Sequence, residues 1–303
     1  GYQRAVAGGS FGVAGGDLLL AVEHDRTDGP WLLPEDLRKY NAVARWSRHG
    51  EDSGIAIDLM GYDGEWVSSD QIPQRAVASG QLDRYGFVDP TNGGESHRYS
   101  LSAQGFQDLE RGRLDYSAYA LDYRLQLFSN FTYNLNSVEG DQFEQFDDRN
   151  VYGGALTWRQ PFALRGHEGD WRVGIDLRHD DVSPVGLHLT EARRRHATIR
   201  EDRVQQTLTG LWVALATRWT PWLRSEIGLR ADRFDHAGRL VAEDDRSPPI
   251  ERAVDVVVVA VAEADRGRPD EDLARPDRSD LDLLEVEFRR SVSKNCSAHG
   301  ATR

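Results

Sequence analysis

The dominant pattern in this sequence is strict alternation of apolar and polar side chains. Over residues 114–133 one parity is small or polar, and the other is the apolar set Tyr119, Leu121, Tyr123, Leu125, Leu127, Phe131 and Tyr133. A helix would distribute this set around its circumference, so the pattern predicts a β-strand. The alternation recurs, more or less clearly, at residues 17–25, 39–48, 53–62, 98–103, 151–159, 170–178, 206–219 and 222–232. The chain is therefore predicted to be all-β, with about ten strands.

Two architectures account for such strands. In a soluble sandwich the apolar parity forms the core, whereas in an outer-membrane barrel it faces lipid and the polar parity lines a wet interior. Aromatic residues lie near the strand ends, at Trp158, Trp171 and Trp219 as well as in residues 119–133, where an interfacial girdle is expected. Charged sets on the polar parity, such as Arg224 and Glu226, suit a hydrated interior.

The predicted connections also alternate in length. Long segments at 26–36, 64–95, 135–149 and 182–203 alternate with shorter ones at 49–52, 108–113, 160–170 and 220–221. Outer-membrane barrels have short periplasmic turns and long outer loops. The pattern favours an antiparallel up-and-down transmembrane β-barrel segment, with a soluble or secreted β-sandwich binding protein as the alternative.

Composition excludes several classes of protein. The net charge of −13 argues against nucleic-acid binding, and the single cysteine, Cys296, excludes a disulfide framework and a cysteine-based zinc site. The glycine-rich stretch 8–16 fits no phosphate-binding motif and is predicted as a turn between strands. The sequence has no nucleophile elbow, and its nine histidines lack metal-ligand spacing. We expect no catalytic residue, metal or cofactor, and no enzymatic activity.

The alternation ends near residue 238. Phe288 is the only aromatic residue beyond it, and the sequence becomes rich in Asp, Arg and Pro. The predicted division is a barrel portion at 1–237 and an irregular tail at 238–303. That tail is interpreted either as a disordered acidic segment or as a stretch translated out of frame.

The strands and loops of residues 1–237 contain stretches, in order, that resemble the β-barrel of TonB-dependent outer-membrane receptors. They are "DGPW" (28–31), "DQIPQRAV" (70–77), "DPTNGGESHRYSLS" (89–102), "RLQLFSNFTYNL" (124–135), "GDQFEQFDDRNVYG" (140–153), "DDVSPVGLHLT" (180–190), "REDRV" (200–204) and "WTPWLRSEIGLRADRFD" (219–235).

The resemblance implies a barrel of about 22 strands in the outer membrane of a Gram-negative bacterium, closed by a plug. Such a receptor imports a scarce ligand, for example a ferric siderophore, and is energised through the TonB complex. No plug or TonB box is recognisable, and roughly half the strands are absent. The expectation is a truncated segment that does not transport alone, or a non-functional gene remnant.

The loop at 64–95 is the best candidate for ligand binding. The candidate residues offer stacking surfaces and directional hydrogen bonds, as a ligand vestibule requires; they are Trp66, Asp70, Gln71, Arg75, Arg84 and Tyr85. The alternative is that these side chains only fold the loop over the barrel mouth. A basic cluster at 191–202 could contact an anionic ligand or lipopolysaccharide phosphates, or could be paired internally with Glu191, Glu201 and Asp202.

Overall fold

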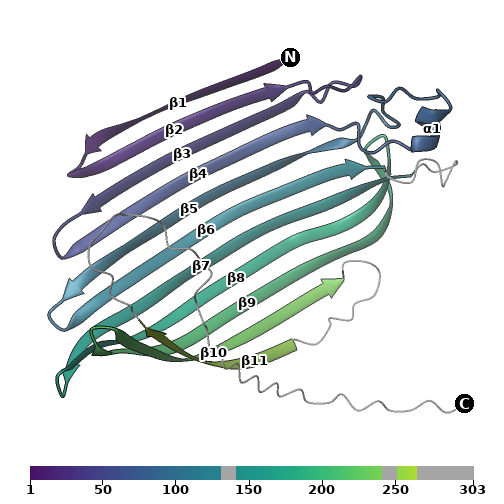
Figure 1. Cartoon of the computed structure of the whole chain (residues 1–303). Helices are drawn as coiled ribbons and strands as arrows, with labels where there is room; N and C mark the ends of the chain where they lie inside the picture. Colours follow the sequence, from purple (N-terminus) through teal and green to yellow (C-terminus); the bar gives the residue numbers. More distant parts are fainter. Residues whose placement is uncertain (131–140, 241–250, 265–303) are drawn as a thin grey trace, which may run out of the picture.

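The structure is a computed structural model that describes residues 1–130, 141–240 and 251–264. In this part of the chain, eleven strands form one antiparallel sheet in sequence order (Figure 1). The strands are β1 (Tyr2–Val13), β2 (Gly16–Thr27), β3 (Leu37–His49), β4 (Ser53–Val67), β5 (Gly93–Leu109), β6 (Gly112–Ser129), β7 (Gln142–Leu164), β8 (His167–Glu191), β9 (Arg194–Thr220), β10 (Leu223–Leu240) and β11 (Glu251–Ala264). One short helix is present among the described residues, α1 (Gln74–Ala78), and it lies in the loop between β4 and β5.

The alternation in the sequence gives this sheet two different faces, because paired residues on neighbouring antiparallel strands project to the same side. One face, called here the apolar face, carries exposed aliphatic side chains that include Leu59, Leu101, Leu156, Ile175, Val213 and Leu229. The opposite face, called the polar face, carries ion pairs such as Arg45 with Asp58 and Arg230 with Asp176. The predicted all-β antiparallel fold is confirmed.

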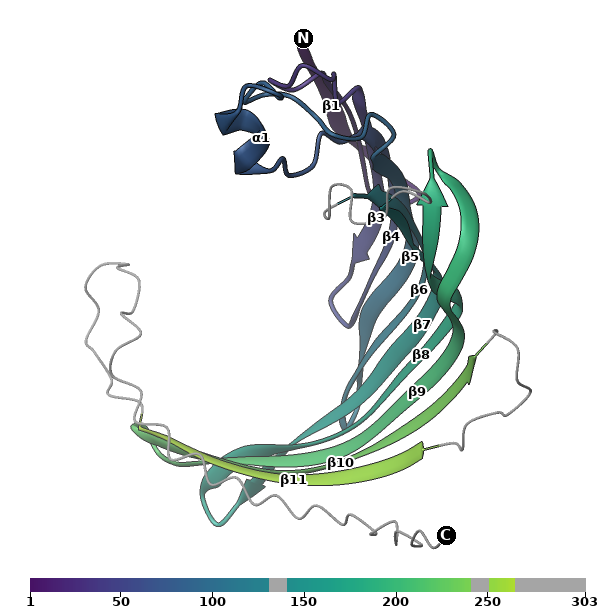
Figure 2. The same ribbon diagram turned by 90° about the vertical axis from the view of Figure 1, so that its right-hand side faces the viewer.

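The sheet is strongly curved into an open arc, as part of a barrel wall would be (Figure 2). Tight turns at 14–15, 50–52, 110–111, 165–166 and 221–222 join the strands at one end, called the turn end. Longer connections at 28–36 and 68–92 lie at the other end, called the loop end, where α1 lies over the concave side. No described helix has the length and apolarity to cross a membrane.

Several predicted connections are strands in the structure. The glycine-rich stretch 8–16 lies mostly within β1, and only Ala14 and Gly15 form the turn. Residues 182–203 form the long β8–β9 hairpin, with a turn at 192–193. The predicted loop 135–149 is strand from Gln142 onward, and its residues 135–140 lie outside the described part. Alternation weakens in these stretches, so pattern alone placed the strand ends too early.

The tail also differs from the expectation of an irregular segment. β10 continues to residue 240, and the backbone of β11 pairs with β10 over its whole length. The run at 256–262 is mostly valine, which has high strand propensity, although the run does not alternate. Residues 241–250 and 265–303 lie outside the described part of the chain.

In β6, the most clearly alternating strand, the apolar side chains were expected on the apolar face of the sheet, but most of them lie on the polar face. Its ladder with β7 has an unshifted register that pairs Leu121 with Val151, and Val151 in turn pairs with Asp180. Tyr123 also lies on the polar face, where the guanidinium of Arg149 is 5.9 Å from its ring centroid. The large apolar side chains of β6 from Tyr119 to Leu127 therefore belong to the polar face, and the positions between the aromatic rows on the apolar face, Ala118 and Ala120, are small.

Candidate functional site at the loop end of the sheet

Two rows of aromatic side chains border the apolar face. The ladder register places one row toward the turn end, at Trp46, Tyr116, Trp158 and Trp171, and the other toward the loop end, at Tyr40, Tyr99 and Tyr152. Along β3 and β7 the two rows lie six residues apart, which is about 20 Å of strand. Aliphatic side chains fill the space between the rows. This is the pattern of a lipid-facing band about 25 Å tall with interfacial aromatic girdles.

Of the girdle residues predicted from the sequence, Trp158, Trp171 and Trp219 lie on the apolar face. Tyr119 lies on the polar face, where it covers Gly153. Phe131 and Tyr133 lie outside the described residues.

At the loop end, two connections far apart in the sequence are joined. The rings of Trp31 and Tyr85 have centroids 6.1 Å apart, and the backbone N–H of Leu32 donates to the carbonyl of Tyr85 at 2.9 Å. The indole N–H of Trp31 also donates to Glu35 at 2.5 Å. Loops 28–36 and 68–92 therefore form one composite surface, which we call the loop rim.

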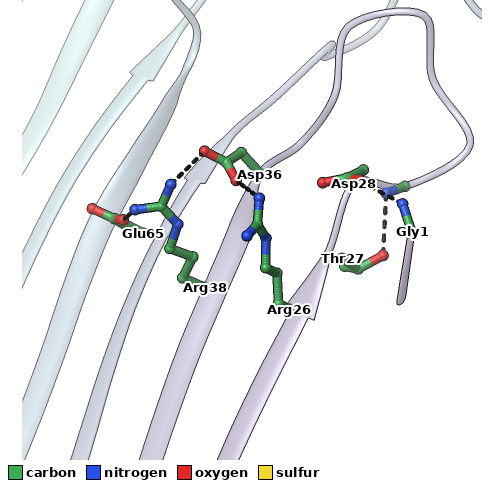
Figure 3. Close-up of polar contacts among 8 residues, drawn as sticks. Gly1, Arg26, Thr27, Asp28, Asp36, Arg38 and Glu65 are labelled. Atoms are coloured by element: carbon green, nitrogen blue, oxygen red, sulfur yellow. Dashed lines mark hydrogen bonds and ion pairs between the residues drawn. The ribbon is translucent and has the colours of Figure 1, made fainter. Parts of the chain in front are cut away.

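Ion pairs fasten the first of these loops to the ends of β2, β3 and β4 (Figure 3). The carboxylate of Asp36 lies between two arginines, 3.1 Å from Arg26 and 2.9 Å from Arg38. Arg38 also contacts Glu65 at 3.0 Å, and Asp28 accepts a hydrogen bond from the amino group of Gly1. These groups satisfy one another's charge, so their role in this arrangement is to hold the loop.

The loop residues predicted to bind a ligand occupy different settings. Trp66 is half-buried at the end of β4, with its ring beside Gly94. Asp70 has a φ of 47° and accepts a hydrogen bond from Ser68, while its Oδ2 atom is buried without a partner among the described residues. The exposed candidates are Gln71, Arg75, Arg84 and Tyr85.

Tyr85 is the one predicted residue whose aromatic partner the structure identifies, and that partner is Trp31. Sequence reasoning missed Trp31 as a site residue, although it lies within the quoted stretch "DGPW". The 54 positions that separate the two residues explain this, because nothing local links them. The exposed cations Arg75 and Arg84 lie in the same loop as Tyr85.

A buried polar network fixes the base of the second loop. Gln142, 2% exposed at the start of β7, donates to Thr91 at 2.8 Å and to Asn92 at 3.1 Å. Its carbonyl oxygen accepts from Thr190 at 3.1 Å and from the backbone N–H of Arg193 at 2.8 Å. One glutamine side chain thus ties loop 68–92 to the tip of the β8–β9 hairpin.

A second part of this network is ionic. Glu144 is fully buried and accepts hydrogen bonds from Arg195 and, at 2.6 Å, from Gln126. Burial opposes its ionisation, yet the hydrogen bonds from Arg195 and Gln126 outweigh burial, so the pKa of Glu144 lies below its ordinary value. His188, paired with Glu144 in the ladder, is 1% exposed, and burial together with the charge of Arg195 lowers its pKa.

The basic cluster at 191–202 is therefore largely engaged within the protein. Arg193 donates to the carbonyls of Thr91 and Asn92, Arg195 pairs with Glu144, and Arg200 pairs with Asp202. Within the described residues, no group of histidine, cysteine and acidic side chains could hold a metal ion. Gln142 and Arg193 join segments that are about fifty to one hundred positions apart. The sequence around each of them carries no signal of these contacts.

Comparison with solved structures identifies the fold. The chain is similar to the ferric citrate transporter FecA in its unliganded form, with a TM-score of 0.68 and 11% identity over 86% of this chain and 38% of that one. It is also similar to the ferric-catecholate import receptor Fiu from E. coli K12 in its closed form (TM-score 0.61, 8% identity, 86% of this chain and 46% of that one). A third similar structure is the alcaligin outer-membrane receptor FauA from Bordetella pertussis (TM-score 0.51, 12% identity, 85% and 38%).

No family model and no curated protein sequence matches the chain. The chain spans less than half the length of each of these three structures. At such low identity the likeness concerns the fold, which is that of the β-barrel of TonB-dependent receptors. The fold expected from the resemblance in the sequence is thus confirmed.

Proposed function

We propose that this chain is barrel wall of an outer-membrane receptor in a Gram-negative bacterium, and that the receptor imports a scarce ligand such as a ferric siderophore. Import is non-enzymatic in this proposal. It is energised by the TonB complex, which acts through a plug that the barrel encloses. The similar structures include a ferric citrate transporter and a ferric-catecholate import receptor, which supports this class of ligand.

The observation that carries the proposal is the apolar face with its two aromatic rows. Leu59, Leu101 and Val213 on this face are 45–57% exposed, and no described element covers them. A surface of this size in water would promote aggregation, whereas in lipid it has its natural solvent. The single curved sheet also lacks the second packed sheet that a β-sandwich requires, at least within the described residues.

The loop rim is the side from which a ligand would enter. Trp31 and Tyr85 provide stacking surface, and the exposed side chains of Arg75 and Arg84 provide positive charge close by in the same loop. Ferric chelates are commonly anionic and have planar groups, so aromatic rings can stack on them and guanidinium groups can pair with their charge. The six loop residues predicted from the sequence, Trp66, Asp70, Gln71, Arg75, Arg84 and Tyr85, remain proposed ligand contacts.

Two adjacent residues allow a direct test of the membrane orientation. Leu59 and Met60 are neighbours on β4, they are 57% and 52% exposed, and they project from opposite faces. We expect Leu59→Arg to destabilise the lipid-inserted chain by about 2–4 kcal/mol, because it places a charge in the lipid-facing band. Met60→Arg on the polar face should change the free energy of unfolding by less than about 1 kcal/mol.

The measurement is the fraction of full chain that refolds in lipid and migrates at a heat-modifiable position on a gel, over a urea series. Equal effects of the two substitutions would contradict the orientation. Folding of the wild-type chain as a monomer in plain buffer would overturn the membrane assignment itself, because the apolar face would then need no lipid.

A further inference from the structure

We infer that the polar face carries a pocket for the acyl chain of an amphiphilic ferric chelate, formed by Leu125 of β6 and by Val185 and Leu187 of β8. This inference rests on the proposed function and deepens it, because it narrows the ligand from ferric chelates in general to those that carry an aliphatic chain. The pocket is separate from the loop rim, which offers aromatic rings and positive charge instead.

Large aliphatic side chains on the polar face are a feature that a hydrated interior does not explain. Leu125 projects from the same side of β6 as Leu121, and it pairs with Asp147, which in turn pairs with Val185. Leu187 lies two residues beyond Val185 on the same face. Leu125, Val185 and Leu187 are all partly exposed. Exposed apolar surface that gathers at one place marks a binding groove.

These three side chains line one pocket of about 380 Å³, a volume within the range of small-molecule sites. Gln145, Asp147 and Arg200 complete the lining from the same face. Phe146 also borders the pocket, but its ring projects from the opposite side of the sheet, where it pairs with Gln126. The side chains inside the pocket are therefore aliphatic or polar, and none of them is aromatic.

The charged groups of the pocket are already paired within the protein. Arg200 forms an ion pair with Asp202, and Asp147 accepts a hydrogen bond from Nε of Arg149 at 2.8 Å. An anionic group would find no unpaired cation here, and an aromatic group would find no ring to stack on. The group that fits this lining is an uncharged aliphatic one, which an acyl chain supplies.

The pocket lies at the end of the sheet where a ligand would enter. Leu125 is five residues beyond Ala120, which pairs with Tyr152 of the aromatic row toward the loop end. Five residues of strand span about 17 Å, so the pocket is beyond the lipid-facing band. In the proposed orientation, membrane lipid contacts the opposite face of the sheet and a different height. The acyl chain therefore belongs to a soluble ligand that enters from the loop end.

The test uses the full chain refolded in lipid nanodiscs. The probe is ferrioxamine B acylated on its terminal amine with an octanoyl chain that ends in a diazirine. On irradiation, wild-type protein should be labelled on β8 at the pocket, as mapped by mass spectrometry after digestion. Octanoyl ferrioxamine B without diazirine should suppress this labelling at a concentration at least about tenfold lower than acetyl ferrioxamine B does, because each fully buried methylene contributes about fourfold in affinity.

Two variants and a second probe locate the chain. Leu187→Asn should reduce labelling about tenfold. Leu189→Asn, at the next position on the same face and outside the pocket lining, is the matched control and should be labelled as wild type is. Phosphatidylcholine with the same diazirine chain, built into the nanodiscs, should label the apolar face, for example at Leu101, and should leave Leu187 unlabelled.

Each remaining outcome overturns the inference. Equal suppression by the acetyl and octanoyl compounds would do so without any variant, which covers the case that Leu187→Asn does not fold. Equal loss of labelling in Leu189→Asn would show a general effect of polarity on this face. Labelling of Leu187 by phosphatidylcholine would assign the pocket to membrane lipid. All of these results leave the proposed function intact, whereas a wild-type chain without a heat-modifiable form in lipid would overturn both.

Discussion

Arg230 on β10 reaches across β9 to Asp176 on β8, with 2.7 Å between Nη1 and Oδ2. The residue of β9 that lies beneath this ion pair is Gly210, which pairs with both Asp176 and Asp232 in the ladders. A Cβ atom at position 210 would overlap the guanidinium of Arg230 and would lie 2.7 Å from Asp232. The contact between strands two apart therefore exists because the strand between them has no side chain there.

This relationship predicts the result of a double-mutant cycle. Arg230 and Asp176 are each about 38% exposed, so Asp176→Asn should destabilise the sheet by less than about 1 kcal/mol. In a Gly210→Ala background the same substitution should have no effect, because the alanine has already displaced the guanidinium. The free energy of unfolding in lipid measures both steps. An undiminished effect of Asp176→Asn would show that the pair tolerates the added methyl group.

The buried glutamine predicts how loop 68–92 is held. Gln142→Ala leaves the hydrogen-bonding groups of Asn92 and Thr190 without their partner, and we expect it to cost about 1–3 kcal/mol. The loop should become sensitive to limited proteolysis while the strands stay folded. Gln145→Ala, an exposed position on the other side of β7, is the control. Equal protease resistance of both variants would mean that other contacts hold the loop.

His188 predicts a pH dependence of the β8–β9 hairpin. It lies nine residues beyond His179, which pairs with Tyr152 of the aromatic row toward the loop end, and so it is outside the lipid-facing band. Because its pKa is lowered in the folded state, its contribution to stability is present above about pH 6.5 and is lost as the pH falls through the folded pKa.

Hydrogen exchange of the hairpin amides, measured between pH 7.5 and pH 5, should therefore show weaker protection at the lower pH after correction for intrinsic rates. His188→Gln should flatten this dependence, whereas His167→Gln at the turn end should not. The charged groups that face His188 are Glu144, Arg195 and Glu201, and the pKa of Glu144 is lowered, so the effect of that carboxylate begins at a lower pH. An unchanged profile in His188→Gln would assign the effect to those groups instead.

The loop rim predicts where a ferric chelate binds. Tyr85→Ala removes the partner of Trp31, and we expect it to weaken binding of ferric citrate or a ferric tris-catecholate about tenfold. Trp66→Ala and Arg84→Gln should also weaken binding, since they are proposed contacts in the same loop. Quenching of tryptophan fluorescence in the folded full chain measures the affinity.

Phe11→Ala, at an exposed aromatic position near the turn end, is the control for loss of a ring. Unaltered affinity in all three loop variants would remove the loop from the binding site. Loss of the folded form in Trp66→Ala alone would show that this residue, half-buried beside Gly94, is structural.

The strands could be predicted from sequence where one face meets lipid and the other meets water, because that difference enforces alternation. Within β8 the alternation is clear from Trp171 to Leu177 and fades toward Glu191, where both faces meet water and either parity can be polar. The long hairpin was therefore mistaken for a loop. In β6, Tyr119 and Leu121 were read as lipid-facing because apolar side chains were assumed to point outward, yet the ladder places them inward.

The candidate site was harder to predict for a different reason. Its loop was recognised from polar and aromatic content, but the contact of Trp31 with Tyr85 and the network around Gln142 depend on segments brought together by the sheet. No spacing rule connects Asn92 with Arg193, which lie 101 positions apart. Long-range polar contacts of this kind leave no periodic trace in the chain.

The glycines of the polar face share one arrangement. Gly54, Gly153, Gly174 and Gly210 are each covered by a large side chain from another strand, namely Phe106, Tyr119, Trp212 and Arg230. A ring or guanidinium that lies against a glycine stays close to the sheet. The height of the polar face above its backbone is thus set at four positions by side chains that are missing. A single methyl group at any of them would lift a much larger neighbour off the wall.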